Sequence, residues 1–225
     1  MLEELGQNIW GSVADYHLGL LAIPHRMTVV RTASGGLVLH SPVEPDDAIR
    51  ASLESLGPIE AIVWPSWWHD LYLREWAAAC PAAKLYVSPS LQRATQSMSI
   101  AGILDETKPL WPEVEQLHID RLAVNFNEFV FFHRPGRCLI VADLVVNVHD
   151  DLHMATKIFF HVIGAYPGPR IPSSYRLAVR DRSYLRAKFD RVLAWDFDCV
   201  IMGHGDVLAS GGKAAFEKAC AEFLS

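Results

Sequence analysis

Two short apolar segments in the second half of the chain constrain the fold most, because each delivers a metal-binding type of side chain at its end. The segment CLIVADLVVN carries Asp143 after an apolar run, and CVIMGHGD carries His204 in the same way. Runs of this length and composition are typical of buried strands. Ligands of open α/β sheets bind where strands hand over to loops at their carboxyl ends. The sequence therefore predicts a site built from strand ends.

The first half of the chain alternates strand-like and helix-like segments. The turn ASGG separates two apolar runs, which is typical of a hairpin, and Pro45 with two aspartates precedes apolar residues at helical spacing. Such β-α-β-α alternation favours parallel strands joined by crossover helices. The predicted elements are strands at 27–32, 37–42, 61–66 and 84–89, and helices at 44–57 and 71–80.

The second half has a looser start and a regular end. Residues 98–113 carry prolines without a clear period and are predicted to be a loop. Pro135-Gly136 separates two strand-like runs and indicates another hairpin. No linker divides the chain, so we expect one α/β domain over residues 1–225. The remaining predicted elements are helices at 152–164, 181–195 and 213–224 and a strand at 198–205.

Composition excludes several classes of function. The net charge of −6 argues against nucleic-acid binding, which needs a basic surface. No apolar stretch approaches the ~20 residues of a membrane span, and the N-terminus resembles no secretory signal. The four cysteines are scattered without a CxxC pair, as expected of thiols in a reducing compartment. We therefore expect a cytoplasmic protein with a small-molecule ligand and no membrane or nucleic-acid partner.

Polar residues of one chemical kind follow several of the predicted strands. Imidazole and carboxylate groups together are the ligands of zinc, iron and manganese in proteins. For any single residue the alternative is an ordinary hydrogen-bonded side chain at a strand end. Because several strand ends share this feature, a metal site is a specific hypothesis. The candidates are His40, His69, Asp70, Asp143 and His204.

Four segments together resemble the metallo-β-lactamase-like superfamily, and more specifically a divergent bacterial branch of unknown function. They are HSP (40–42), PSWWHDLYLREW (65–76), NEFVFFHRPGRCLIVADL (127–144) and WDFDCVIMGHGD (195–206). The resemblance spans most of the chain. It implies a four-layered αββα sandwich whose metal site lies along one edge, where two sheets meet.

The resemblance also implies which ligands this chain keeps. The superfamily pattern HxHxDH falls on residues 66–71, where Ser66, Trp68 and Leu71 stand in place of histidines and Asp70 keeps the aspartate. Asp143 matches the carboxylate that bridges two metals, and His204 matches a ligand of the second metal. His69 falls on a variable position, from which a shift of one residue would bring it to the site. His40 occupies a position where an aspartate is common.

Two hypotheses follow. In the first, the protein is a metal-dependent hydrolase-like enzyme with at most one divalent transition metal, held by His69, Asp143 and His204 with His40. The ion activates water, and Asp70 or Asp143 orients it. In the second, the chain is a metal-free, catalytically inactive scaffold for ligand binding or protein interaction. Trp67 and Trp68 are candidates for an apolar pocket over the site, with core packing as the alternative.

Overall fold

The computed structural model describes residues 1–121 and 126–225 and contains two β-sheets. The first sheet has the strand order β1-β2-β3-β4-β5-β6-β7. Strands β1 to β4 pair antiparallel, whereas β4 to β7 run parallel. The bounds are β1 Glu3–Gly6, β2 Ile9–Leu18, β3 Leu21–Arg31, β4 Leu37–His40, β5 Ile59–Trp64, β6 Lys84–Val87 and β7 Gly102–Ile103.

The second sheet has the order β11-β10-β9-β8. Its strands β10 and β11 are parallel, and the register places Val141 beside Met202 at their carboxyl ends. Strand β9 pairs antiparallel with both β8 and β10. The bounds are β8 Val114–Ile119, β9 Glu128–His133, β10 Cys138–Val141 and β11 Cys199–Met202.

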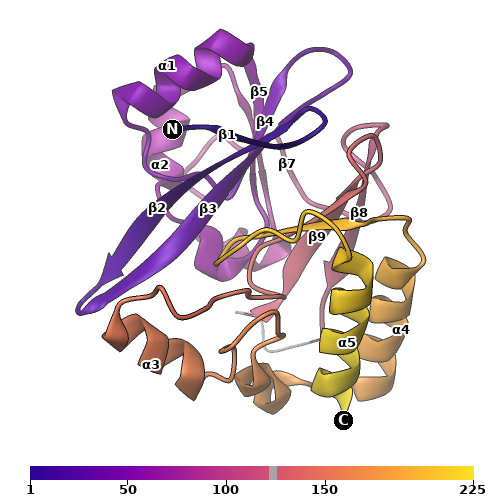
Figure 1. Ribbon diagram of the computed structural model, residues 1–225. Helices are drawn as coiled ribbons and strands as arrows, with labels where there is room; N and C mark the ends of the chain where they lie inside the picture. Colours follow the sequence, from indigo (N-terminus) through magenta and orange to yellow (C-terminus); the bar gives the residue numbers. More distant parts are fainter. Residues whose placement is uncertain (122–125) are drawn as a thin grey trace.

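Helices cover the outer faces of both sheets (Figure 1). Helix α1 begins after Asp46, whose carboxylate accepts the Ile49 N–H, and α4 begins after Asp181 in the same way. The helices predicted from the sequence at 44–57 and 181–195 include both of these starts. The bounds are α1 Asp47–Leu56, α2 Leu73–Ala79, α3 Met154–Val162, α4 Arg182–Leu193 and α5 Gly212–Leu224, with 3₁₀ turns η1 Trp67–His69, η2 Pro89–Leu91 and η4 Ser173–Ala178.

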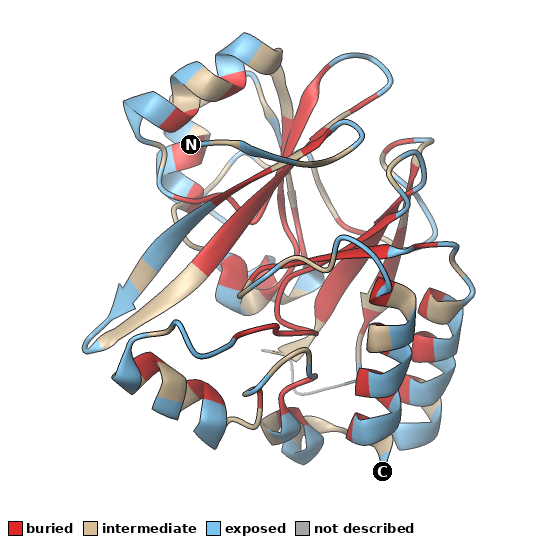
Figure 2. Cartoon of the chain, in the orientation of Figure 1, coloured by how far each residue is buried: buried red, intermediate tan, exposed pale blue. Residues whose placement is uncertain are grey.

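Buried residues lie along the strands and on one side of several helices (Figure 2). Their side chains form three main layers of core. One lies between α1, α2 and the first sheet, where Leu53 and Trp76 pack. A second fills the space between the two sheets around Phe131 and Ile140. The third joins the second sheet to α4 and α5 through Phe189 and other apolar residues. Helix, sheet, sheet and helix thus follow one another, which confirms the predicted αββα sandwich.

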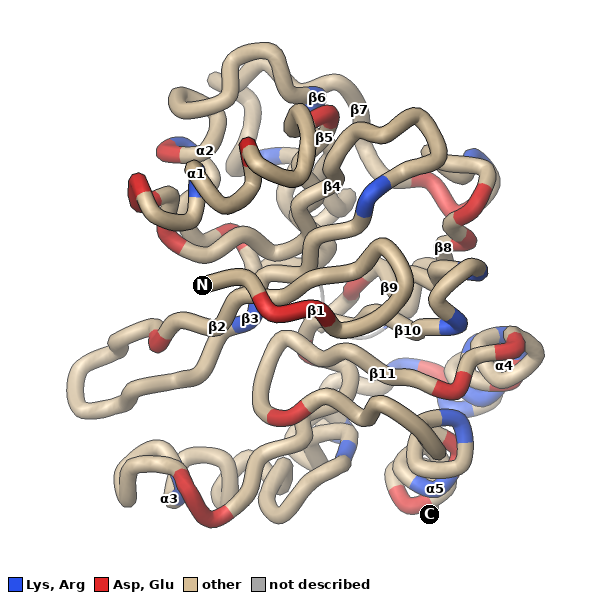
Figure 3. The backbone as a smooth tube through the Cα atoms, turned by 45° about the horizontal axis from the view of Figure 1, so that its top comes forward, with Lys and Arg blue, Asp and Glu red and all other residues tan. Residues whose placement is uncertain are grey.

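The charged residues lie mainly outside these layers. Figure 3 shows acidic and basic residues interspersed along α4 and α5, whereas most strand backbone carries neither. The region of Arg170 to Arg191, rich in basic residues, therefore includes the solvent-facing side of a helix. Among the described residues, no helix is both long and apolar enough to cross a membrane.

The largest difference from the sequence-based prediction lies near the N-terminus. Strands β2 and β3 form a long hairpin, of which only residues 27–31 were predicted as strand. The hairpin reaches α3, where the Thr156 hydroxyl donates to the Ala22 carbonyl and accepts the Ala22 N–H, each at 3.0 Å. Strand β8 was also missed. The hairpin matters here because β3 runs beside the polar cluster described next.

Candidate metal site

Three side chains from separate parts of the chain meet at the edge shared by the two sheets. His69 follows β5, Asp143 follows β10 and His204 follows β11. The Nε2 atom of His69 lies 3.2 Å from Asp143 Oδ1, and that of His204 lies 3.1 Å from the same oxygen. The ligand atoms of the three residues all lie within 4.8 Å of one another. We call this group the His-Asp-His cluster.

His69 reaches the cluster because the chain leaves β5 in a 3₁₀ turn. Side chains three residues apart in such a turn lie on the same side. Ser66, which precedes η1, and His69, which ends it, therefore both face Asp143. The Ser66 hydroxyl donates to Asp143 Oδ2 at 3.2 Å, while His69 lies against Oδ1. The two intervening tryptophans point elsewhere.

His204 lies in a turn whose two flanking glycines are required sterically. A Cβ atom on Gly203 would lie 2.5 Å from His69 Cε1, so only glycine allows β11 to approach His69 this closely. Gly205 adopts a φ of +88°, a conformation that favours glycine. The sequence GHG therefore serves both the backbone turn and the close packing of the cluster.

Asp143 is held through its backbone by a second buried carboxylate, that of Glu128. One Glu128 oxygen accepts the Ala142 N–H at 3.1 Å, and the other accepts the Asp143 N–H at 2.8 Å. Glu128 is 1% exposed. Its residue also forms an isolated β-bridge with Ser66, which ties the start of β9 to the segment after β5. Glu128 thus connects two of the three parts of the site.

The charges in this cluster oppose the effects of burial. Burial alone would raise the pKa of Asp143, but the charges and hydrogen bonds of His69 and His204 outweigh it and lower that pKa. Burial would lower the pKa of His204, but the hydrogen bond and charge of Asp143 raise it overall. Burial, followed by the Asp143 charge, raises the pKa of Glu128 to about 8. A positive charge at this edge is therefore favourable.

A third imidazole, that of His25, lies against the cluster from β3. Its ring centroid is 4.8 Å from that of His69 and 6.1 Å from that of His204. The ring Nε2 lies 3.1 Å from the Ser41 carbonyl oxygen, which only accepts, so Nε2 carries the hydrogen. Burial, followed by the charges of His69 and His204, lowers the pKa of His25 well below its usual value. His25 is thus a neutral neighbour of the cluster.

Four residues predicted from the sequence lie outside the cluster. His40 ends β4 with its ring edge-on to Phe131 at 5.5 Å, and burial lowers its pKa to about 3. Asp70 is exposed at the end of η1. Trp67 packs partly buried against the core around α2, and Trp68 is 53% exposed. Neither tryptophan is among the residues that line the three hollows described for this chain, and a pocket formed by the two tryptophans stays a prediction.

His25 and Glu128 were not predicted from the sequence, because neither occupies a strand end of the predicted kind. Glu128 was present in the quoted segment NEFVFFH, where a carboxylate opens an otherwise apolar strand. Acidic residues are rarely buried without a partner. A carboxylate in an apolar strand therefore could have indicated that Glu128 interacts with another buried group. His25 belongs to the part of the β2–β3 hairpin that was not predicted.

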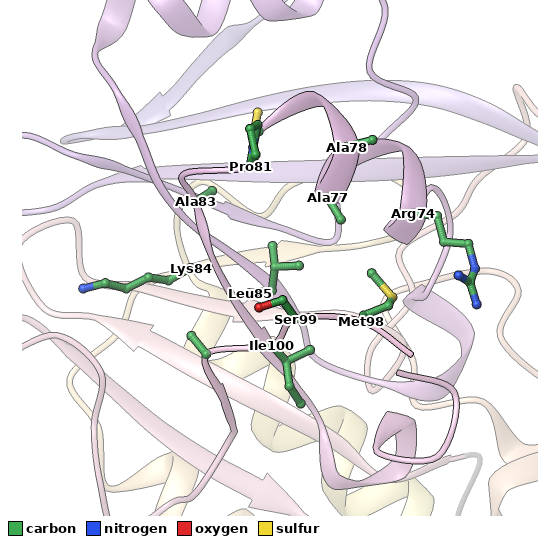
Figure 4. A pocket seen from close by; sticks show the side chains of 12 residues that line it. Arg74, Ala77, Ala78, Pro81, Ala83, Lys84, Leu85, Met98, Ser99 and Ile100 are labelled. Carbon is green, nitrogen blue, oxygen red and sulfur yellow. The ribbon is translucent and has the colours of Figure 1, made fainter. Parts of the chain in front are cut away.

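A separate hollow of about 540 Å³ lies beside α2, β6 and residues 98–101 (Figure 4). Its lining includes alanines, Leu85 and Ile100, with the charged side chains of Arg74 and Lys84 at its margins. In Figure 4 those two side chains extend away from each other. No member of the His-Asp-His cluster lines it. The reactive groups therefore lie elsewhere than in this hollow.

Solved structures with the same fold are metallo-β-lactamases and a related core domain. The chain aligns with a metallo-beta-lactamase from Hirschia baltica at 13% identity and a TM-score of 0.67, covering 100% of this chain and 97% of that one. The FIM-1 enzyme from Pseudomonas aeruginosa in its mono-zinc form aligns at 13% identity and 0.63, covering 98% and 96%. The Flv1 flavodiiron core from Synechocystis sp. PCC6803 aligns at 10% and 0.68, covering 100% and 60%.

These similarities define the class of protein: the chain has the metallo-β-lactamase-like fold, with a possible metal site of two histidines and one aspartate at the shared sheet edge. Residues 7–160 match the family described as Domain of unknown function (DUF4336), and the chain belongs to that family. No curated protein matches the chain in sequence.

Proposed function

We propose that this protein is a metal-dependent hydrolase of a small molecule, with a single divalent transition-metal ion held by His69, Asp143 and His204. The observation that carries the proposal is the approach of two imidazole Nε2 atoms to one carboxylate oxygen, at 3.1 and 3.2 Å. Two imidazoles with a carboxylate suit zinc, iron or manganese. The mono-zinc form of FIM-1 supports a one-ion site in a protein of this fold.

The tautomer of His204 supports a cation between these atoms. Its Nδ1 atom lies 2.7 Å from the Pro24 carbonyl oxygen and therefore carries the hydrogen. In the neutral ring, Nε2 then presents a lone pair to Asp143 Oδ1, and two acceptors face each other. A metal ion held by these two acceptors would remove this conflict, as would a second proton on the ring. The donor set thus fits a divalent cation.

A single ion is favoured because the remaining superfamily positions lack ligands. Ser66 uses its hydroxyl on Asp143 Oδ2, and Trp68 is largely exposed. His40 and Asp70 lie outside the cluster, so they are not part of the proposed ligand set.

The chain's own residues would perform the following tasks. An ion bound at the cluster would supply Lewis-acid polarisation of a substrate oxygen or of water. Asp143 and the two histidines orient that position, and Glu128 fixes the backbone of Asp143. The site is narrow, since the Asp143 and His204 side chains are only 12% and 13% exposed. A small substrate suits this opening.

The test is hydrolysis by purified full-length protein loaded with zinc, iron or manganese, assayed on a panel of small esters, lactones, amides and phosphodiesters. We expect turnover with at least one metal, and none after chelation or in Asp143→Asn. Protein that neither binds metal nor turns over any substrate class would instead favour the alternative, a metal-free inactive scaffold. That alternative draws on one observation: a doubly protonated His204 would satisfy Asp143 and Pro24 without an ion.

A further inference from the structure

Strand β3 contacts the His204 turn through consecutive residues, although it belongs to the other sheet. The Pro24 carbonyl accepts from His204 Nδ1 at 2.7 Å. The ring of His25 lies beside the rings of His69 and His204. The Arg26 N–H donates to the Gly203 carbonyl at 2.8 Å. The segment Pro24-His25-Arg26 therefore lies along the whole turn.

The Arg26 side chain adds two hydrogen bonds to the same turn. Its Nε donates to the Met202 carbonyl at 3.2 Å, and its Nη2 donates to the Gly205 carbonyl at 2.6 Å. One of these carbonyls precedes His204 by two residues, and the other follows it directly. With its backbone N–H included, Arg26 binds carbonyls on both sides of His204.

Arg26 makes these contacts while 7% exposed, which is an unusual place for a guanidinium. Burial lowers its pKa, and the charges of Glu3 and Asp206 act in the opposite direction. No Arg26–carboxylate pair occurs among the ion pairs of the described residues. Arg26 is thus paired with backbone carbonyls of one turn instead of with a carboxylate.

A guanidinium suits this task because its planar fork holds several N–H groups in fixed directions. Lysine has a single flexible ammonium and cannot reproduce both contacts in the same geometry. Apolar residues would fill the space but leave the Met202 and Gly205 carbonyls without these donors.

We propose that Arg26 is a positioning residue that sets the direction of the His204 imidazole towards the metal position. This inference rests on the proposed function, because it takes His204 to be a ligand. Residues that hold metal ligands in place commonly change affinity by ~10–100-fold when replaced. Arg26 is absent from every motif that indicated the site from sequence.

The experiment compares Arg26→Gln and Arg26→Lys with Arg31→Gln in full-length protein. Arg31 is a matched control on the same strand, since its Nη2 also donates to a backbone carbonyl, that of Leu56 at 2.7 Å, but far from the cluster. The probe is Co²⁺, whose visible absorption reports both affinity and ligand geometry. Thermal unfolding of each metal-free variant measures the purely structural effect.

We expect Arg26→Gln to weaken Co²⁺ binding ~10–100-fold and to alter the absorption spectrum, with Arg26→Lys in between. Arg31→Gln should keep both the affinity and the spectrum of the wild type. Unchanged affinity and spectrum in a folded Arg26→Gln would overturn the inference. If Arg26→Gln does not fold, Arg26→Lys decides by the same criteria.

Failure of the proposed function gives a different result. Wild-type protein that binds no Co²⁺ would refute the metal site itself. The role of Arg26 is then read from the imidazole NMR signals of His204 in metal-free protein. A shift of these signals in Arg26→Lys, but not in Arg31→Gln, supports positioning, and unchanged signals contradict it.

Discussion

Two parts of the chain supply the residues of the candidate metal site, and they position these residues in different ways. Asp143 and His204 follow neighbouring parallel strands whose register places Val141 beside Met202, so the second sheet itself brings them together. The segment after β5 instead leaves its sheet as a 3₁₀ turn and contributes only Ser66 and His69. Ligands set by sheet register are fixed by many backbone hydrogen bonds. Ligands set by one turn depend on few contacts.

The comparison also explains why this site differs from the superfamily pattern in one place. The second sheet supplies the expected aspartate and histidine. The turn supplies a histidine from a position that the pattern leaves variable, and its two tryptophans lie away from the cluster. We therefore expect Asp143 and His204, which the second sheet positions, to be indispensable for metal binding. The 3₁₀ turn should tolerate substitutions outside Ser66 and His69.

The largest effect on metal affinity should come from replacing Asp143, the carboxylate that follows a strand of the second sheet. Asp143→Asn removes the charge that both imidazoles face, and we expect metal affinity to fall by at least ~100-fold, more than for loss of a residue that only supports a ligand. Asp70→Asn is the matched control, because Asp70 is exposed at the end of η1. Its affinity should remain within about twofold of the wild type. Equal losses in the two variants, measured by competition with a chelator, would break the comparison.

The next largest effect concerns stability and involves the contact between the His204 turn and the 3₁₀ turn η1. Gly203→Ala places a methyl group 2.5 Å from His69 Cε1 and 2.8 Å from the Ala142 carbonyl oxygen. We expect a loss of about 1–3 kcal/mol in the free energy of unfolding, as for overpacked cores. Gly102→Ala is the control, since its nearest neighbour would be 3.6 Å away. Denaturant unfolding of both variants tests the difference, and equal stability would show that His69 yields freely.

Glu128 gives a pH-dependent prediction for metal-free protein. Its pKa is raised from the ordinary 4.5 to about 8, so the folded state keeps a proton that the unfolded state releases. The contribution of Glu128 to stability therefore falls as the pH rises through this interval, by at most ~1.4 kcal/mol per pH unit for one proton. Glu128→Gln should flatten this fall.

His204 contributes in the same direction as Glu128. Its pKa is raised above 6.5, so its stabilisation is complete below that value and is lost as the pH rises through the folded-state pKa. Part of the decline should consequently remain in Glu128→Gln. Urea unfolding of metal-free wild type and variant between pH 7 and 9 provides the measurement, because the lowered pKa values of His25 and His40 make stability rise with pH only up to about the ordinary histidine value of 6.5. A wild-type stability that rises between pH 7 and 9 would contradict the raised pKa values of Glu128 and His204.

The smallest effect on metal binding is expected for Trp68→His, which restores a histidine of the superfamily pattern in the sequence but not in the cluster. Trp68→His places an imidazole at a position where the pattern has one, yet Trp68 is 53% exposed and points away from the cluster. We expect the ion content per chain and the metal affinity to stay at the wild-type values. A second equivalent of bound metal in this variant would show that the turn is more adaptable than its 3₁₀ geometry indicates.

The sequence predicted those parts of the site that follow from strand ends. Asp143 and His204 stand out because an apolar run precedes each one. The αββα layers were implied by the resemblance, whereas the alternation of elements indicated only parallel strands with crossover helices. The helices that begin near Asp46 and Asp181 could also be predicted from the sequence, because capping is an interaction within the first turn of a helix.

The remaining features depend on contacts between distant segments. The inward direction of His69 requires the 3₁₀ turn, which its one-residue offset from the pattern does not reveal. The roles of His25 and Arg26 depend on β3 of the first sheet lying against a turn of the second. The burial of Glu128 depends on its contacts with Ala142 and Asp143. Tertiary placement decides each case, and the same placement leaves His40 and Asp70 outside the cluster.

The most direct test of the central claim is the metal stoichiometry of the full-length protein. Metal-free wild type is titrated with Zn²⁺, Fe²⁺ and Mn²⁺ in separate experiments, and bound metal is measured by elemental analysis after removal of free ion. The account predicts about one ion per chain for at least one of these metals and none in Asp143→Asn. Background metal in the wild type, or two ions per chain, would contradict it.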